Sequence, residues 1–134
     1  MPGSPTILCI EDETELIDLL RLMLQREGYR FIGAHGGEAG LERIRDEQPD
    51  LVLLDLMMPG VDGWEVYRQL QTDPALAKIP VIVVTAKAQE IDVVLGLHIA
   101  RVADYIVKPF TSQQLLESIR RVLAEGKAES DQGT

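Results

Sequence analysis

The sequence predicts an α/β fold, a doubly wound sheet of five parallel strands with helices on both faces. Two observations support this class. Short apolar runs alternate five times with amphipathic segments along the 134 residues. The runs are also apolar at consecutive positions, as expected of strands that are covered on both faces. Such an alternation favours parallel strands that are joined by right-handed crossover helices.

The five expected strands are short, and prolines mark several of their ends. Pro49 precedes the third strand, Pro80 opens the fourth and Pro109 ends the fifth. Proline has no backbone N–H to donate to a sheet, so it is typical of strand boundaries. The strands are expected at residues 6–10, 29–34, 50–55, 81–84 and 104–107.

The expected helices carry apolar residues three and four positions apart, which is the spacing of one helical face. The first contains Leu16 to Leu24 and should end at Gly28, and Thr111 is a suitable N-cap for the last. The three between them are expected at residues 36–47, 64–71 and 89–100. We therefore predict one domain over residues 1–125. Residues 126–134 are polar, and we expect a disordered tail or the start of a linker.

Charge and hydropathy exclude several classes of function. The net charge is −9, from 13 basic and 22 acidic residues, which argues against direct nucleic-acid binding because phosphate contacts need a positive face. The apolar runs are too short for a membrane span. The N-terminus lacks the basic start and cleavage site of a signal peptide, so we expect a cytoplasmic protein. Cys9 lies in an apolar run and is expected in the core.

Polar side chains follow four of the five expected strands. Glu11 and Asp12 come after the first strand, Asp55 ends the third, Thr85 follows the fourth and Lys108 follows the fifth. In an open parallel sheet, functional sites lie outside the carboxyl ends of the strands. The predicted alternation therefore brings three carboxylates, a hydroxyl and an ammonium to one edge.

A cluster of three carboxylates needs a compensating positive charge. Lys108 can supply one, and a hard divalent cation such as Mg²⁺ can supply another because it prefers oxygen ligands. The group contains no His or Cys, which argues against zinc. A rigidly held Asp55 beside such cations can attack phosphorus, while the cations balance the charge on the phosphoryl oxygens and Thr85 hydrogen-bonds one of them.

Four stretches together carry a specific resemblance to a known family. In chain order they are CIEDE (9–13), LLDLMMPGVDG (53–63), VVTAKA (83–88) and DYIVKPF (104–110). The sequence resembles the receiver domain of two-component response regulators, over residues 6 to 124. The resemblance implies a CheY-like, flavodoxin-like fold whose sheet has the strand order 2-1-3-4-5, counted along the chain. It also implies a cis peptide bond between Lys108 and Pro109.

The resemblance implies a phosphorylation-driven switch of the surface formed by the helix at 89–100, the strand at 104–107 and the last helix. Asp55 would accept a phosphoryl group from a sensor histidine kinase or a phosphotransfer protein. Glu11, Asp12, Asp55 and the main-chain carbonyl of Met57 would hold Mg²⁺.

The remaining motif residues would act after the transfer. Lys108 would pair with the phosphoryl group and Thr85 would move toward it. Tyr105 would then rotate inward. The protein would catalyse its own phosphorylation and dephosphorylation and turn over no other substrate.

One segment departs from the family pattern. Arg101, Val102 and Ala103 stand where the family has Gly-Ala-Asp. The spacing from Thr85 to Lys108 is 108 − 85 = 23 residues, one longer than expected. The affected surface, which comprises the helix at 89–100, the strand at 104–107 and the last helix, is where many relatives form homodimers, so the geometry of a dimer is left open.

Two other functions are considered. A magnesium phosphatase with an aspartyl nucleophile usually has a general acid two residues after the nucleophile, but Met57 occupies that position and cannot transfer protons. A docking module that works without phosphorylation would not need the complete set of acids, Thr85 and Lys108. The sequence does not predict which output domain the receiver controls. We expect that the chain is the N-terminal part of a longer regulator and not a stand-alone receiver.

Overall fold

The five expected strands form one parallel sheet. A computed structural model describes residues 3–86 and 102–132 of the chain. The strands of the sheet are β1 (Thr6–Glu11), β2 (Arg30–His35), β3 (Leu51–Asp55), β6 (Val81–Thr85) and β7 (Asp104–Val107). Their spatial order is β2-β1-β3-β6-β7, and all four pairings are parallel. This confirms the predicted strand order, and each strand lies within one residue of its predicted bounds.

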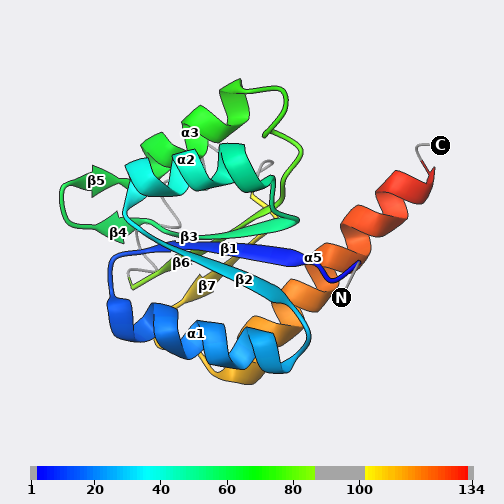
Figure 1. Ribbon diagram of the computed structural model, residues 1–134, viewed down its shortest axis with the longest axis horizontal. Coiled ribbons are helices and arrows are strands. Elements are labelled where there is room, and N and C mark those ends of the chain that lie inside the picture. Colours follow the sequence, from blue (N-terminus) through cyan, green and yellow to red (C-terminus); the bar gives the residue numbers. More distant parts are fainter. Residues whose placement is uncertain (1–2, 87–101, 133–134) are drawn as a thin grey trace.

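The helices cover both faces of this sheet, as predicted. They are α1 (Thr14–Arg26), α2 (Gly37–Glu47), α3 (Gly63–Thr72) and α5 (Ser112–Gln132). Helices α2 and α3 lie on one face, and α1 and the first half of α5 lie on the other (Figure 1). The helix expected at 89–100 lies outside the described residues.

Alternate residues of the central strands fill two hydrophobic layers. Leu8 and Ile10 of β1 point into the layer beneath α2 and α3, whereas Ile7 and Cys9 point into the layer beneath α1 and α5. Because successive side chains of a strand point to opposite faces, a strand that is buried on both sides must be apolar throughout. Cys9 is buried, as expected of a core residue.

The helix ends follow the predicted capping signals. Gly28 has a φ of +92°, which a residue with a side chain rarely adopts, and it follows the C-cap residue of α1. At the start of α5, the amide of Gln114 donates to Thr111 Oγ1 over 3.1 Å, and the amide of Thr111 donates to Gln114 Oε1 over 2.8 Å. This reciprocal arrangement is a capping box.

The prediction of a disordered tail was wrong for residues 126–132. Helix α5 continues through Gly126 to Gln132 and extends beyond the sheet (Figure 1). The polar composition suggested disorder, but Glu, Lys and Ala are good helix formers, and one glycine costs only about 1 kcal/mol in a helix interior. The division between domain and linker at 125/126 stays a prediction.

A small hairpin follows β3. The segment expected as a loop contains two antiparallel strands, β4 (Met57–Met58) and β5 (Val61–Asp62), which pair Met57 with Asp62 and Met58 with Val61. The turn between them is Pro59–Gly60, and Gly60 has a φ of +72°. The hairpin lies at the edge where the parallel strands end (Figure 1).

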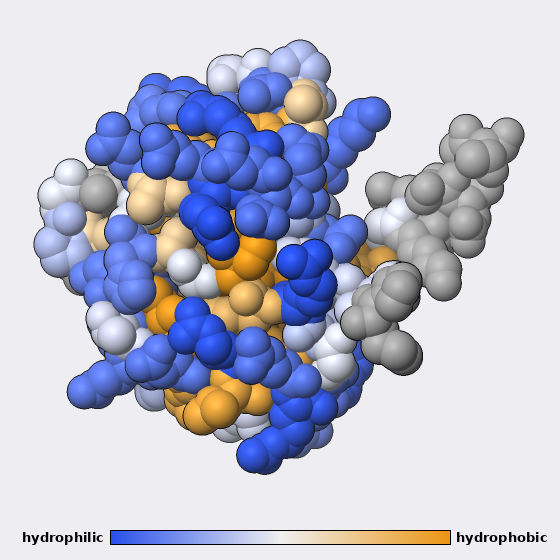
Figure 2. Space-filling view, viewed as in Figure 1, coloured by the Kyte–Doolittle hydropathy of each residue, from blue (hydrophilic) through white to orange (hydrophobic). Residues whose placement is uncertain are grey.

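The face of the molecule in Figure 2 is mostly polar, with apolar residues in its centre and over α1. Figure 2 shows polar residues over most of this face and apolar residues in its lower part, where Figure 1 places α1. Two leucines of that helix, Leu19 and Leu22, are exposed. Among the described residues, no helix is long and apolar enough to cross a membrane.

The sheet model of the core makes a stability prediction. Leu8 in β1 is 0% exposed, so Leu8→Ala should lower the free energy of unfolding by about 2–5 kcal/mol, through lost burial and the cavity that remains. The matched control is Leu22→Ala, because Leu22 is 66% exposed and surface changes usually stay within about 0.5 kcal/mol. Urea denaturation measures both. Equal losses in the two variants would contradict the assigned core.

Candidate functional site

The carboxyl ends of four neighbouring strands bring the predicted site residues together. Glu11 and Asp55 are the last residues of β1 and β3, and the pairing of Ile10 with Leu54 places them side by side. Thr85 ends β6 and pairs with Val107, the residue before Lys108. The backbone amide of Lys108 also donates to the carbonyl of Thr85 over 2.8 Å.

Three carboxylates and one ammonium form a compact cluster at this edge. Glu11, Asp12 and Asp55 each offer an oxygen, and these atoms lie within 4.8 Å of one another. Lys108 Nζ donates to Glu11 Oε2 over 2.8 Å and to Asp55 Oδ2 over 3.4 Å. Glu13 Oε1 lies 4.0 Å from the same nitrogen. The ammonium therefore bridges the two buried acids, and Glu13 stands at the exposed rim.

Backbone amides orient both buried carboxylates. The amide of Met57 donates to Asp55 Oδ1 over 3.0 Å. The amides of Asp12 and Glu13 approach Glu11 Oε1 at 3.2 and 3.4 Å. Each buried acid therefore has one oxygen on backbone and the other on Lys108, which fixes the rotation of the carboxylate planes.

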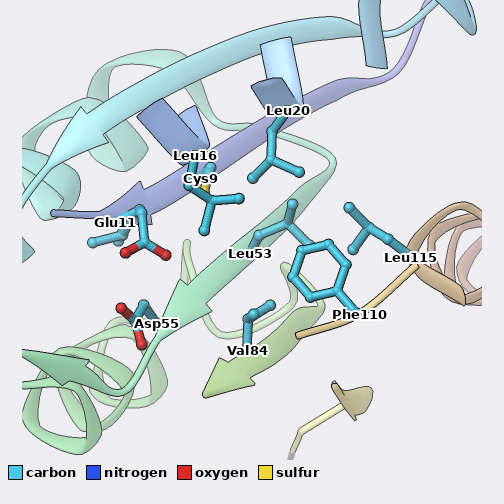
Figure 3. Close-up of a pocket in the computed structure, with 10 residues that line it drawn as sticks. Cys9, Glu11, Leu16, Leu20, Leu53, Asp55, Val84, Phe110 and Leu115 are labelled. Atoms are coloured by element: carbon cyan, nitrogen blue, oxygen red, sulfur yellow. The ribbon is translucent and has the colours of Figure 1, made fainter. Parts of the chain in front are cut away.

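An apolar wall lies behind the two buried acids. Figure 3 shows the carboxylates of Glu11 and Asp55 on one side of a small cavity and mainly apolar side chains on the other. This wall includes Leu53, Val84 and Phe110. Carboxylates with so little water around them are strongly affected by neighbouring charges.

The pKa of Glu11 is raised to about 7, mainly by burial and also by the neighbouring Asp55, although the hydrogen bond from Lys108 and the charge of Lys108 act to lower it. Burial alone would lower the pKa of Lys108, but its hydrogen bond to Glu11 and the charge of Asp55 raise it above the ordinary value. The lysine therefore stays charged at neutral pH, whereas Glu11 is held close to its point of protonation.

The donor set fits a small, hard cation. The ligands of Mg²⁺ are oxygens at about 2.0–2.1 Å, which puts neighbouring ligands about 3 Å and opposite ligands about 4 Å apart. The three carboxylate oxygens, within 4.8 Å of one another, approach this spacing. Glu11 and Asp55 are buried and Asp12 is exposed, so the group is open to solvent on one side, where waters could complete the shell.

The remaining predicted site residues lie at this edge or close to it. Thr85 ends β6 and is fully buried. Tyr105 pairs with Val83, two residues before the end of β7, and is 48% exposed. Met57, on the first strand of the hairpin, is partly exposed. The peptide bond between Lys108 and Pro109 is cis, as expected.

Sequence reasoning missed two participants. Glu13 was part of the CIEDE stretch, but nothing in a linear pattern showed that its carboxylate reaches Lys108. Gly63 was part of MMPGVDG, and its close contact with the backbone beside Asp55 became visible only in three dimensions. In both cases the motif contained the signal without indicating the contact.

The sheet order and the acidic pocket define a class, the receiver-type α/β domains, and comparison with known proteins gives the family. The family model of the response regulator receiver domain matches residues 7–120. The chain therefore belongs to the response regulator receiver domain family.

Curated relatives are response regulators. The chain is 43% identical over 127 residues to the transcriptional regulatory protein AfsQ1 of Streptomyces coelicolor, covering 94% of this chain and 54% of that protein. It is 39% identical over 128 residues to the sensory transduction protein RegX3 of Mycolicibacterium smegmatis, covering 96% of this chain and 54% of that protein. The chain thus spans about half the length of these relatives.

Solved structures agree. A CheY-like response regulator receiver domain protein from Methanospirillum hungatei superposes with a TM-score of 0.85 at 30% identity, covering 95% of this chain and 99% of that chain. A response regulator from Chloroflexus aurantiacus gives a TM-score of 0.81 at 29% identity, covering 91% and 99%. The chain is a receiver domain of the two-component type.

The raised pKa of Glu11 predicts a pH-dependent stability in the absence of divalent metal. The folded protein keeps this proton up to about pH 7, whereas the unfolded chain releases it near the ordinary pKa of 4.5. The contribution of Glu11 to stability is therefore present below pH 4.5 and is lost as pH rises through 7. Glu11→Gln cannot titrate. Between pH 4.5 and 7.5 its unfolding free energy should rise relative to wild type, by at most about 3 kcal/mol.

Urea denaturation in a metal chelator at several pH values measures this difference. Glu42→Gln, an exposed position of α2, is the control for loss of one acidic side chain. A difference between Glu11→Gln and wild type that is the same at every pH would show that folding does not raise the pKa of Glu11.

Proposed function

We propose that Asp55 is the phosphoacceptor of this receiver domain and that a partner protein supplies the phosphoryl group from a histidine. The observation that carries the proposal is the bridging position of Lys108 between Glu11 and Asp55. Asp55 is 3% exposed, and its neighbours are a fixed cation and a carboxylate pair that fits Mg²⁺. An acid in that setting is suited to hold phosphate rather than to cap a turn.

The proposed transfer replaces a phosphorus–nitrogen bond with a phosphorus–oxygen bond. A carboxylate oxygen of Asp55 forms a bond to phosphorus as the phosphorus–nitrogen bond of the phosphohistidine breaks, and the electron pair returns to the imidazole, which takes up a proton. Lys108, already 3.4 Å from Asp55 Oδ2, stabilises negative charge on the phosphoryl oxygens. The backbone amide of Met57 holds the carboxylate in place during the attack.

Bound Mg²⁺ would neutralise further charge on the same oxygens. Glu11, Asp12 and Asp55, with the main-chain carbonyl of Met57, are the groups proposed to hold it.

The proposed switch starts from the coupling of β6 to β7. The backbones of Thr85 and Lys108 are joined by a hydrogen bond, so a displacement of one residue would also displace the other. A phosphoryl group on Asp55 would attract the Thr85 hydroxyl and Lys108, and Tyr105, now partly exposed on β7, would turn inward. Such a charge biases an existing equilibrium between two states. Homodimer formation through β7, α5 and residues 89–100 stays a prediction.

The partner would approach over α1. This helix starts at Thr14, directly after the rim residues Asp12 and Glu13, and it presents the exposed side chains of Leu19 and Leu22. A groove lined by these leucines also includes Met23 and, from α5, Leu116. An apolar surface on the helix that begins at this rim would let a protein donor bind while its histidine reaches Asp55. That the partner is a histidine kinase or a phosphotransfer protein stays a prediction. The cytoplasmic location of the chain also stays a prediction.

Intact mass after incubation with Mg²⁺ and a small acyl phosphate tests the proposed acceptor. Wild type should gain the mass of one phosphoryl group, and removal of Mg²⁺ by a chelator should abolish the gain. Asp55→Ala should show no gain. Asp46→Ala, an exposed aspartate of α2, is the matched control and should behave like wild type.

A gain that persists in Asp55→Ala would overturn the assignment. The same reaction separates the phosphatase alternative, because sustained release of phosphate from esters at many turnovers would mark an enzyme. Binding of a partner kinase with no mass change in any condition would favour the docking module.

A further inference from the structure

We infer that Gly63 is a positioning residue for the acidic pocket, because no larger residue fits against the backbone that carries Asp55 and Met57. The inference rests on the proposed phosphoacceptor function and its Mg²⁺ site. It concerns the second glycine of the PGVDG stretch, which has no role in the chemistry described above.

The hairpin brings Gly63 back onto the end of β3. The pairing of Met57 with Asp62 and of Met58 with Val61 means that the next opposed residues are Leu56 and Gly63. Gly63 is also the first residue of α3. The chain thus leaves Asp55, turns at Pro59–Gly60, and returns to press the start of a helix against the residue that follows the acceptor.

The contact leaves no space for a side chain. An added Cβ at Gly63 would lie 2.5 Å from Leu56 Cα, 2.9 Å from the carbonyl oxygen of Asp55 and 3.0 Å from that of Leu56. All three are backbone atoms, which cannot move aside as the end of a side chain can. Non-bonded carbon atoms normally approach to about 3.5–4.0 Å, so an alanine would force a shift of the backbone itself.

Both sides of the contact are held. On the strand side, Leu56 is buried, its amide donates to the carbonyl of Val84 over 3.3 Å, and Asp55 pairs with Val84 in the sheet. On the helix side, α3 is anchored in the core by Val66 and Leu70. A forced shift therefore falls on the short link between them, which is residues 55–57.

This link carries two of the four proposed metal ligands. The Asp55 carboxylate is oriented by the Met57 amide over 3.0 Å, and the Met57 carbonyl belongs to the same residue. A displacement at Leu56 would move the two ligands relative to each other. Mg²⁺ demands near-ideal octahedral geometry, so its affinity should respond more strongly than the fold does.

Gly63→Ala is the test, with the Mg²⁺ dissociation constant as the readout. It is obtained by calorimetric titration and from the Mg²⁺ dependence of the unfolding free energy. We expect affinity to fall by about tenfold or more, as for other changes that misplace metal ligands, and phosphorylation by a small acyl phosphate to slow. If Gly63 had a structural role only, Gly63→Ala would lower the free energy of unfolding and leave the Mg²⁺ dissociation constant of the folded protein unchanged.

Gly33→Ala is the matched control. Its Cβ would also meet an atom at 2.5 Å, but that atom is Ile17 Cγ2, a side-chain carbon between β2 and α1, and the contact involves none of the proposed metal ligands. We expect this variant to lose stability and to keep its Mg²⁺ affinity. Gly60→Ala is a second control, since it strains the turn at a φ of +72° with nothing within 4 Å of the added Cβ.

The outcomes separate the two proposals. Wild type that neither binds Mg²⁺ nor takes up a phosphoryl group would defeat the proposed function itself. If the wild type binds Mg²⁺ and takes up a phosphoryl group, but Gly63→Ala has an unchanged Mg²⁺ affinity, the positioning role alone is overturned. Failure of Gly63→Ala to fold, while Gly33→Ala folds, would also overturn it, because Gly63 would then support the fold and not the pocket.

Discussion

The acidic pocket depends on the interaction of the Lys108 ammonium with the carboxylates of Glu11 and Asp55. It lies 2.8 Å from Glu11 and 3.4 Å from Asp55, and it comes from the far end of the sheet, 97 residues from Glu11 in sequence. Without a cation, carboxylates this close and this poorly hydrated repel one another and take up protons. The lysine reduces the repulsion between the carboxylates when no metal is bound. It also lies where a phosphoryl group on Asp55 would need a positively charged partner.

The sheet supplies the rest of the geometry. Parallel strands end at one edge, so a residue placed at the end of each strand arrives at the same rim whatever the sequence distance. Strands buried on both faces leave their last side chains little freedom, and backbone amides then fix the carboxylate oxygens. Rigidity at Asp55 thus follows from apolar packing behind it, which also raises the pKa of Glu11 by removing water.

The sequence was sufficient for the fold and for predicting which polar residues meet at the ends of the strands. Apolar runs and prolines placed the strands to within one residue, and the strand-end rule placed Glu11, Asp55, Thr85 and Lys108 at one edge. It was insufficient wherever the answer lay in contacts between distant atoms. Which acid Lys108 prefers, the reach of Glu13 and the space at Gly63 depend on side-chain geometry that no linear pattern contains. The tail was misjudged for another reason, because polar composition was weighed above helix propensity.

Glu11, Asp12 and Asp55, at the ends of two neighbouring strands, are proposed to form one cation site. The most direct measurement is a Mg²⁺ titration followed by the side-chain carboxyl ¹³C signals of Glu11, Asp12 and Asp55. If they form one site, all three signals shift together, with one common dissociation constant, while the signal of an exposed acid such as Glu42 stays unchanged. Shifts at Asp12 alone, or separate constants for Asp55 and Glu11, would contradict it.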